Sequence, residues 1–410
     1  MAALVPVFMS MLAASLAAAP ASAQTAQTGA RNVAQTNAQT NAQTNTQTNT
    51  QTNTRCGDWA AYRSFVAHAL QADGRVFDAS TPAQQSTSEG QSYGMFFALV
   101  ANDRVNFDKM LGWTRANLAG GQFAPGNLRL PAWQWGKRPD GTWGVIDANA
   151  AADADLWLAY DLLQAGRLWR APDYTALGTA LASEIAQREV ADLAGFGPML
   201  LPGPQGFVSG DVTRLNPSYL PLPVLRGLAH ALRGGSWNAL AQNAFKLVAA
   251  TAPRGFAPDW AAWRAGQFVV DPKNGDTGSY DAIRVYLWAG LANPGDPLAK
   301  PWLDAVRGMA SRVAQTGVPP EKVSATSGAG TGEGPLSYWG ALAPYFAALG
   351  DAKSVGLART RLAVLDGGGA GSEPVYYDRV LGLFGGGAVN GRYRFDVNGR
   401  LVPAWEGACQ

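Results

Sequence analysis

Apolar residues recur every three to four positions in about twelve segments of the chain, and Gly- and Pro-rich stretches separate these segments. This spacing is typical of amphipathic α-helices that bury one face. Strand-like patterns are few and short, and the clearest is GQFVVD at 266–271. The chain is therefore predicted to be mainly helical, with helices that begin near Asp58, Glu89, Phe107, Asp153, Tyr174, Pro217, Trp237, Tyr280, Leu298, Pro335, Ala352 and Pro374.

The segment STSEGQSYGMFFALV, residues 86–100, carries a clear helix start. Ser88 and Gln91 form the Ser-x-x-Gln pattern of a capping box, which makes Ser88 the expected N-cap. From Tyr93 onward the aromatic and aliphatic residues recur at helical spacing. Glu89 then takes the first helical position, at the end of the helix rather than on its buried face.

Twelve consecutive helices joined by short loops can pair as antiparallel hairpins and close into a double ring. Every second helix is then an inner helix, all inner helices run in the same direction, and their N-termini gather at one mouth. This alternation brings Glu89, Asp153, Asp281 and Tyr219 to one opening, although they are far apart in sequence. The loops that lead into the inner helices are rich in polar groups: STSEGQSYG, NAAADADLW, RLNPSYLP, DTGSYDAIR, GTGEGPLSYWG and GSEPVYYD.

Each acid also has a purely structural interpretation. Glu89 can complement the helix dipole, and Asp153 suits an N-cap with Asp155 in the first turn. Two acids at i and i+2 cannot both serve as that single cap, however. Asp281 lies one turn before Arg284, whose charge can hold Asp281 ionised. Local pattern alone leaves the structural and the chemical interpretations open.

Three separate acids at one mouth favour glycoside hydrolysis. That reaction needs a protonated carboxyl that donates to the leaving oxygen and an ionised carboxylate that activates water or attacks the sugar. The helix dipole lowers the pKa of Glu89, which is unfavourable for a proton donor. Burial beside Tyr93 and repulsion from a neighbouring carboxylate must outweigh it.

Trp133, Trp135 and Trp143 lie in one short stretch, LPAWQWGKRPDGTWGVIDANA. Trp133 and Trp135 alternate, so in an extended loop they share a face that can stack along a glycan. The alternative is a loop whose aromatic rings pack onto the core.

Other reaction classes lack the residues that they need. The only two histidines, His68 and His230, lie in helical patterns without a second metal ligand at the usual spacing. This argues against a zinc site and against a Ser-His-Asp triad, and no glycine-rich phosphate-binding loop occurs. No cofactor is expected. The formal net charge is +2 without a basic stripe, so nucleic acid is not an expected partner, whereas fourteen tryptophans suit a neutral glycan.

The two ends of the chain predict export. Residues 1–23 resemble a signal peptide that ends in an Ala-Ser-Ala cleavage site, and no later segment is apolar for long enough to span a bilayer. Residues 24–54, a run of Gln, Thr and Asn, are predicted to be a disordered linker. The folded domain is then 55–410, in a soluble periplasmic or secreted protein. Cys56 and Cys409 bracket this domain and either form a disulfide or remain two thiols.

Four motifs together resemble glycoside hydrolase family 8, closest to the periplasmic endoglucanases (cellulases) encoded with bacterial cellulose synthase. The likeness covers essentially the whole folded part, and its motifs occur in the order EGQSYGM (89–95), ADADLWLAYDLLQAGRLW (152–169), NPSYLP (216–221) and SYDAIRVYLWAG (279–290). This resemblance implies an all-α (α/α)6 barrel, with six inner and six outer helices and a few short strands in loops.

The resemblance also implies an endo-acting β-1,4-glucanase that inverts the anomeric centre. By motif, Glu89 is the proton donor, Asp281 is the general base that activates water, and Asp153 binds and distorts the sugar at the cleavage site. The residues expected to contact the glucan are Tyr93, Trp133, Trp135, Trp143, Asp155, Tyr219 and Arg284.

Three positions depart from the family pattern. Ala152 stands where the family has Ser or Thr, Leu158 where it has Ile or Met, and Asp161 where it has a small residue. None of these changes removes a catalytic group. The sequence therefore predicts a cellulase in bacterial cellulose biosynthesis, with cellulose chains as substrate and the cellulose synthase complex as a candidate partner. The alternatives are a hydrolase of the same fold that acts on chitosan, xylan or mixed-linkage glucan, and a non-catalytic glycan-binding subunit.

Overall fold

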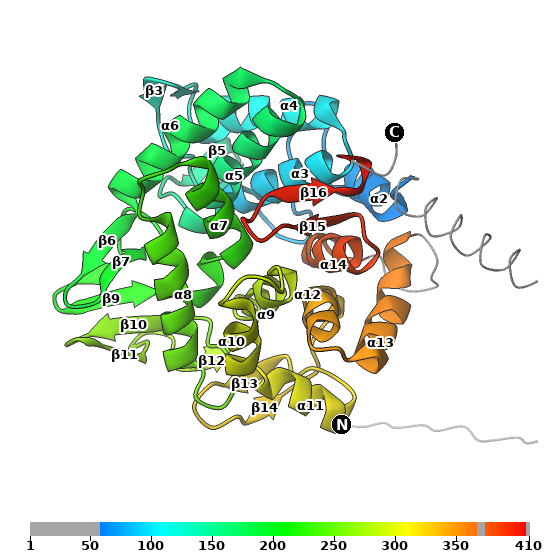
Figure 1. Ribbon diagram of the computed structural model, residues 1–410. Helices are drawn as coiled ribbons and strands as arrows, with labels where there is room; N and C mark the ends of the chain where they lie inside the picture. The colour runs from blue at the N-terminus through cyan, green and yellow to red at the C-terminus, as the bar shows by residue number, and fades with distance from the viewer. Residues whose placement is uncertain (1–57, 367–373, 407–410) are drawn as a thin grey trace, which may run out of the picture. The chain divides into compact units, whose positions relative to one another are not determined.

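An inner ring of helices lies inside an outer ring in the computed structural model, which describes residues 58–366 and 374–406 (Figure 1). Neighbours in the inner ring pack on one another, and each outer helix packs against an inner one. The inner helices are α3 (Ser88–Val100), α5 (Ala152–Leu168), α7 (Leu222–Ala231), α9 (Ile283–Leu291), α12 (Leu336–Ala348) and α14 (Tyr376–Val389). The outer helices are α2 (Ala60–Ala69), α4 (Arg104–Trp113), α6 (Pro172–Arg188), α8 (Trp237–Thr251), α10 (Ala299–Ala305) and α13 (Ala352–Leu362). The fold is an (α/α)6 barrel, as predicted.

The helices differ most from the prediction at two places. The helix expected to run on from Leu298 is divided into α10 and α11 (Gly308–Thr316), so the described residues contain thirteen α-helices rather than twelve. A Cβ atom at Gly308 would lie 2.5 Å from the carbonyl oxygen of Arg254, so this backbone approach requires glycine. The helix expected at Pro217 begins at Leu222, because Pro217–Tyr219 form a separate 3₁₀ turn.

Aromatic side chains fill the centre of the inner ring. Phe96 of α3, Trp157 of α5, Trp288 of α9 and Phe384 of α14 are all buried, and their ring centroids lie 4.9–5.6 Å apart in the contacting pairs. Such pairs contribute about 0.5–1.5 kcal/mol each beyond the area that they bury. This cluster closes the centre of the barrel and forms the floor of the mouth.

Two inner helices approach each other backbone to backbone. A Cβ atom at Gly385 of α14 would lie 1.7 Å from the carbonyl oxygen of Gly340 of α12. Glycine at both positions therefore brings α12 and α14 close together.

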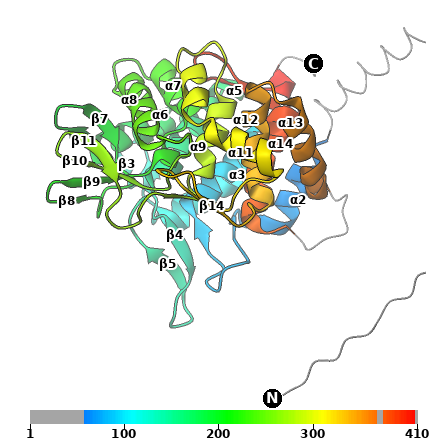
Figure 2. The same cartoon turned by 90° about the horizontal axis from the view of Figure 1, so that it is seen from below.

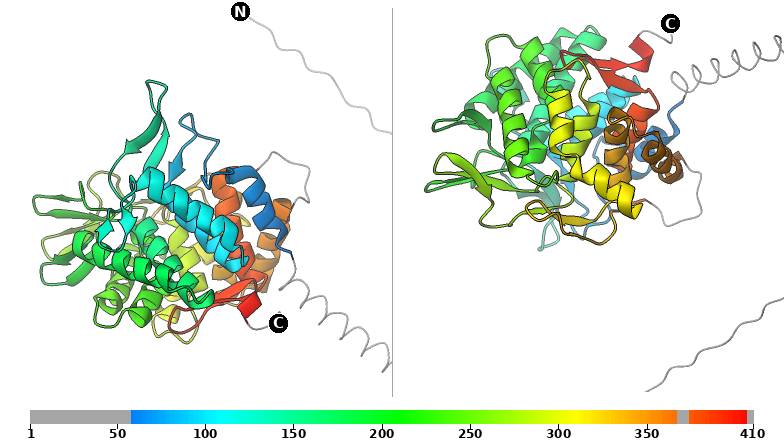
Figure 3. Two further views of the ribbon diagram at one scale, coloured as in Figure 1. Left: turned by 90° about the horizontal axis from the view of Figure 1, so that it is seen from above. Right: turned by 60° about the horizontal axis from the view of Figure 1, so that its bottom comes forward.

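Strands occupy the loops that precede the inner helices, together with a few hairpins elsewhere. Strand β1 leads into α3, the loop of β4 and β5 leads to α5, and β9 leads to the 3₁₀ turn before α7. Figures 2 and 3 show that the β4–β5 hairpin projects from the helices. The strand predicted at 266–271 is confirmed as β11. In sheet order the strands are β1 (Ser86–Thr87), β4 (Gln134–Lys137) and β5 (Trp143–Asp147); β11 (Gln267–Val270), β10 (Ala261–Arg264), β9 (Val212–Leu215) and β8 (Val208–Ser209); β12 (Thr277–Gly278), β13 (Lys322–Ser324) and β14 (Gly330–Thr331); and the pairs β2 (Phe123–Ala124) with β3 (Asn127–Leu128), β6 (Val190–Leu193) with β7 (Gly197–Leu200), and β15 (Tyr393–Phe395) with β16 (Leu401–Pro403).

Several predictions concern residues outside the described ranges. The signal peptide 1–23, the linker 24–54, Cys56 and Cys409 all lie there. Within 58–366 and 374–406, no helix combines the length and the apolar character that crossing a membrane requires.

Candidate active site

Glu89 lies at the mouth of the barrel, in the first turn of α3. The N-cap of this helix is Thr87, whose Oγ1 accepts a hydrogen bond of 3.0 Å from the backbone N–H of Gly90. The predicted capping box is therefore wrong by one residue. Its other member, Gln91, turns into the core, where its Oε1 accepts a hydrogen bond from the backbone N–H of Val76. The Glu89 carboxylate accepts a hydrogen bond of 3.1 Å from the Tyr93 hydroxyl and remains 27 % exposed.

Asp153 lies in the first turn of α5 and is almost completely buried, at 1 % exposure. It is not the N-cap that the sequence suggested, because α5 begins at Ala152 and the N-cap residue, Ala151, makes no side-chain cap. The Asp153 Oδ1 accepts a hydrogen bond of 2.9 Å from the backbone N–H of Ala154. Its carboxyl group is also hydrogen bonded to that of Glu89.

Asp281 lies in the turn that precedes α9. Asn216 donates a hydrogen bond of 3.1 Å from its Nδ2 to the Asp281 Oδ2, and the Asp281 carboxylate is 33 % exposed. Asp259 holds the same turn in place by accepting hydrogen bonds from the backbone N–H groups of Ser279 and Ala282. Asp281 is therefore fixed from two sides and open to the mouth on the third.

Arg284 joins the three acids. Its Nη1 lies 3.2 Å from the Glu89 Oε1, and its Nη2 lies 3.2 Å from the Asp281 Oδ1 and 3.7 Å from the Asp153 Oδ2. The guanidinium group is 4 % exposed, and it also donates a hydrogen bond of 3.0 Å to the Ser218 hydroxyl. Because both Nη atoms belong to one small planar group, the contacted oxygens of Glu89 and Asp281 lie within about 9 Å of each other.

The site separates the pKa values of Glu89 and Asp153. Burial opposes ionisation at both. At Glu89 the Arg284 guanidinium and the hydrogen bonds from Asp153 and Tyr93 outweigh burial and hold the pKa below its usual value. At Asp153 burial and the neighbouring charge of Glu89 raise the pKa well above its usual value. These opposite shifts favour a protonated Asp153 beside an ionised Glu89, so the raised pKa that a proton donor requires is not found at Glu89 in the unliganded site. Burial, with the charges of Asp259 and Glu89, raises the pKa of Asp281 despite the opposing Arg284.

Tyrosines from two helices complete the polar lining. The Tyr219 ring lies 5.8 Å from the Arg284 guanidinium, so it belongs to the same cluster as the three acids. Sequence analysis missed Tyr376 and Tyr377 of α14. Tyr377 is hydrogen bonded to Arg284 and donates a bond of 2.6 Å to the carbonyl oxygen of Tyr280. The Tyr376 hydroxyl is buried beside Gly90, where an added Cβ would lie 2.7 Å from it, and it meets no hydrogen-bond partner within the described part of the chain. The signal that indicated them is the loop GSEPVYYD, which the alternation of helices had already brought to the mouth.

The tryptophan-rich loop is a hairpin beside Glu89. Strand β4 pairs with β1, the strand that leads into α3. The rings of Trp135 and Trp143 stack with centroids 5.5 Å apart, and the Arg75 guanidinium lies 4.6 Å and 4.8 Å from them. Trp143 is 44 % exposed. Trp133 precedes β4, and a bulge lies between Gln134 and Trp135, so the simple alternation that placed Trp133 and Trp135 on one face does not apply.

Asp155 does not reach the mouth. Its side chain is completely buried and is hydrogen bonded to Glu189, at the end of α6. This position corrects the expectation that Asp155 contacts the glucan. Tyr93, also expected to touch substrate, is buried beneath Glu89 and supports that carboxylate instead.

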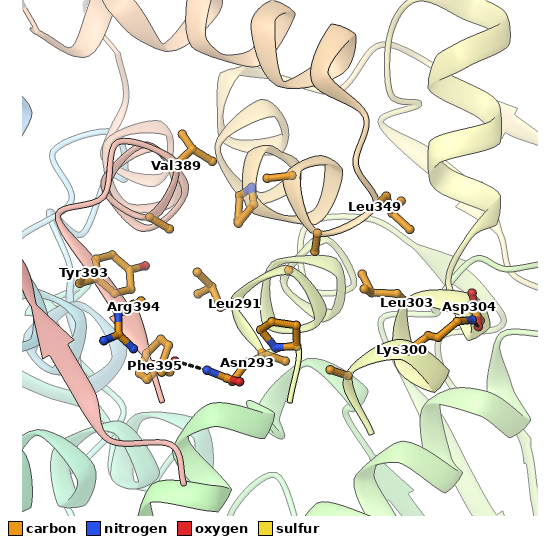
Figure 4. A pocket seen from close by; sticks show the side chains of 18 of the residues that line it. Leu291, Asn293, Lys300, Leu303, Asp304, Leu349, Val389, Tyr393, Arg394 and Phe395 are labelled. Atoms are coloured by element: carbon orange, nitrogen blue, oxygen red, sulfur yellow. Dashed lines mark hydrogen bonds and ion pairs between the residues drawn. The ribbon is translucent and has the colours of Figure 1, made fainter. Parts of the chain in front are cut away.

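A cavity of about 510 Å³ lies at the other end of the barrel (Figure 4). It is lined by the C-terminal ends of α9, α12 and α14 and by β15, with Leu291, Leu349, Val389 and Phe395 among its walls. The catalytic candidates lie at the N-terminal ends of inner helices, so this cavity is separate from the acid cluster.

A barrel with carboxyl groups that converge at one mouth is typical of glycoside hydrolases that cleave sugars with paired acids. The family model "Glycosyl hydrolases family 8" matches residues 30–391. A protein of Xanthomonas axonopodis pv. citri named "Endoglucanase" is 48 % identical over 351 residues, which cover 86 % of this chain and 90 % of that protein. An "Endoglucanase" of Pseudomonas fluorescens is 42 % identical over 371 residues, 86 % of this chain and 92 % of that protein.

Among solved structures, the endo-1,4-D-glucanase from Vibrio fischeri ES114 superposes with a TM-score of 0.79 at 40 % identity, and the match covers 85 % of this chain and 99 % of that one. The chain belongs to glycosyl hydrolase family 8. It is an enzyme of that family, as the four motifs indicated.

Proposed function

We propose that this protein is an endo-1,4-β-glucanase that cleaves cellulose chains with inversion at the anomeric carbon. The single observation that carries the proposal is the shared contact of Arg284 with Glu89 and Asp281, which holds two acids from distant segments across one opening. The names of the Xanthomonas and Vibrio relatives support the reaction and the linkage. The bound of about 9 Å between the two carboxyl oxygens admits the 6.5–9.5 Å that an inverting pair needs for a water molecule.

In this proposal Asp281 is the general base. Asn216 and Arg284 orient its carboxylate, and its exposed side faces the mouth, where a water molecule can bind. The water loses a proton to Asp281 and its oxygen forms the new bond to the anomeric carbon. The bond from that carbon to the leaving oxygen breaks, and that oxygen takes a proton from the acid on the opposite face.

Glu89 delivers this proton and Asp153 stores it. The Glu89 side chain is 27 % exposed, and a sugar bound against it displaces the water from this exposed part. The desolvation then raises the pKa of Glu89. The proton passes from Asp153 to Glu89 along the hydrogen bond between them, and Glu89 passes it to the leaving oxygen. The Asp153 carboxylate that results lies beside Arg284 and can hold a sugar hydroxyl at the cleavage site.

Glu89→Gln tests the acid role. We expect kcat on carboxymethylcellulose to fall by about 10²–10⁴, the usual contribution of general acid catalysis, while glucan binding persists. The loss should be much smaller with an aryl cello-oligosaccharide whose phenol leaves without protonation. Glu184→Gln on outer helix α6 is the matched control and should retain full activity. A folded Glu89→Gln protein with wild-type turnover of cellulose would contradict the assignment.

Proton NMR of fresh product tests the stereochemistry. Inversion of a β-linkage releases the α-anomer first, and initial release of the β-anomer would overturn the role of Asp281 as a base. Reducing-sugar assays on chitosan and xylan beside carboxymethylcellulose separate the proposed linkage from the alternative polysaccharides. Activity on none of them would favour the non-catalytic alternative.

We further propose that the protein is exported to the periplasm or medium and takes part in cellulose biosynthesis. In this proposal residues 1–23 are the signal peptide, 24–54 the linker and 55–410 the catalytic domain. The support is the Ala-Ser-Ala site in the sequence and the resemblance to endoglucanases encoded with cellulose synthase. N-terminal sequencing of the exported protein should begin at Gln24. Co-purification with the synthase complex tests the candidate partner.

A further inference from the structure

A second pair of carboxyl groups lies behind Asp153. Asp155 is two residues further along α5, and Glu189 is the residue that ends α6; both are completely buried. Their carboxyl groups are hydrogen bonded to each other. Among the described residues, no other hydrogen-bonding group meets any of their four oxygens, and neither acid forms a salt bridge.

Two carboxylates cannot bond to each other without a proton, so this pair holds at least one. Complete burial without a cation favours the uncharged form further, because an unpaired charge in the interior is costly. Burial raises the pKa of Asp155, and burial with the charges of Asp155 and Asp153 raises the pKa of Glu189. The titratable groups that face the pair are Asp153 on α5 and, beyond it, Glu89 from α3 and Arg284 from α9.

The pair joins the turn that carries Asp153 to a neighbouring outer helix. The N-terminus of α5 has no side-chain cap, so its first turn lacks the usual support at that end. The backbone N–H of Ala152 instead donates a bond of 3.0 Å to the carbonyl oxygen of Pro202, and Leu201 is bonded to the carbonyl oxygen of Glu189. The Asp155–Glu189 contact is a side-chain link between the same two segments.

We infer that Asp155 and Glu189 are positioning residues, which together form an uncharged carboxyl pair that holds the first turn of α5 and so fixes Asp153 beside Glu89. The pair holds the backbone of that turn from within the protein interior, where Asp155 and Glu189 are both completely buried. The catalytic consequence rests on the proposed function, whereas the protonation of the pair does not.

Glu189→Gln and Glu189→Leu test the inference. An amide donates and accepts as a protonated acid does, so we expect Glu189→Gln to keep kcat and KM within about twofold and to leave the pH–rate profile unchanged. Glu189→Leu leaves Asp155 without a partner, and kcat should fall at least tenfold while KM changes by less than threefold. Retained activity in Glu189→Gln would show that the pair acts without a charge, whereas a loss in this variant would show that Glu189 must be ionised. Equal losses in both variants, or no loss in the leucine variant, would overturn the inference.

The protonation itself is measured without substrate. A folded-state pKa above the unfolded value means that folding takes up a proton, so stability is greatest at low pH and falls as pH rises. Each proton taken up on folding makes the unfolding equilibrium constant rise about tenfold per pH unit between about pH 5 and pH 7. Glu189→Gln takes up one proton fewer than the wild type, so its unfolding constant should rise about tenfold less per pH unit. Glu184→Gln, on the same helix, should leave the slope unchanged. An unchanged slope in Glu189→Gln would refute a protonated pair even if the enzyme is a cellulase, whereas a changed slope in a protein without cellulase activity would refute only the proposed function.

Discussion

Arg284→Met removes a guanidinium charge that contacts all three acids of the mouth. Methionine retains much of the length and apolar surface of the arginine stem, so the change is chiefly the loss of the guanidinium group. Glu89 then loses an ion pair at 3.2 Å, and Asp281, which is one-third exposed, loses one that solvent already screens. Glu89 therefore dominates the effect on stability.

The size of the effect follows from two limits. A pair at 3.2 Å contributes about 5 kcal/mol at an effective dielectric constant of about 20. Glu89 can avoid this loss by taking up a proton, which costs about 3.7 kcal/mol at pH 7 for a carboxyl whose ordinary pKa is about 4.3. We therefore expect Arg284→Met to lower the free energy of unfolding by about 3–4 kcal/mol at pH 7, or Tm by about 5 °C in a chain of this length.

The loss should depend on pH with a definite sign. In the wild type, Arg284 lowers the pKa of Glu89, and this stabilisation is present above the unfolded pKa and is lost as pH falls. Without Arg284, burial raises the pKa of Glu89, so the variant loses stability as pH rises. The difference between the two proteins should shrink to about 1 kcal/mol at pH 5.

Thermal or chemical unfolding at pH 5 and pH 7, together with kcat on carboxymethylcellulose, measures both effects. We expect kcat to fall by about 10²–10³, as when a preorganised charge-stabilising donor is removed from an active site. Arg226→Met is the matched control: Arg226 forms a partly buried ion pair of 2.7 Å with Asp296, away from the acids, so the variant should lose stability but keep kcat within threefold. The same loss of stability for Arg284→Met at both pH values, or kcat within tenfold of the wild type, would refute the reasoning.

Two further substitutions test single contacts. Asp161 is completely buried, no hydrogen-bond partner meets its oxygens among the described residues, and burial raises its pKa. Asp161→Ala should therefore raise the free energy of unfolding by about 1–2 kcal/mol at pH 7 and by less at pH 5. A lower Tm at both pH values would contradict this. Trp143 stacks on Trp135 and exposes its outer face at the mouth. Trp143→Ala should raise KM for long glucans about two- to tenfold and leave kcat nearly unchanged. A fall in kcat at constant KM would indicate a role in the chemistry instead.

Periodicity predicted a mainly helical chain that can close into a double ring, and the resemblance to glycoside hydrolase family 8 supplied the (α/α)6 barrel. Of the thirteen residues of α3, twelve are buried, and the pattern of apolar residues marks such a helix clearly. The alternation of inner and outer helices then fixed which N-termini meet, and this brought Glu89, Asp153 and Asp281 together correctly. The division of α10 from α11 did not disturb that alternation, because both segments follow the inner helix α9 and precede the inner helix α12.

The failures concern contacts between segments that are distant in sequence. Gln91 does not cap α3, because its side chain lies in the core and accepts a hydrogen bond from the backbone N–H of Val76, and Thr87 is the N-cap instead. No local sequence pattern predicts this contact. Asp155 was assigned to the substrate because it follows Asp153 by two residues, but a helix turns successive side chains by about 100°, and Asp155 faces α6 instead. Glu189, its partner, lies in an ordinary helical pattern and has no signal of its own.

Glu89 and Asp153 compete for one proton at the mouth of the barrel. The N-termini of inner helices carry partial positive charge and Arg284 adds a full one, but burial outweighs them at Asp153 and Asp281, whose pKa values are raised. A glycosidase that ionised all three would have no acid to offer. Glu89 and Asp153 are hydrogen bonded to each other and Asp153 is shut off from water, so only one of them can lose its proton at modest cost. Arg284 favours Glu89 as the ionised member, because it contacts Glu89 at 3.2 Å but Asp153 only at 3.7 Å. In the proposed mechanism, the proton then moves from Asp153 to Glu89 when a sugar displaces water from Glu89.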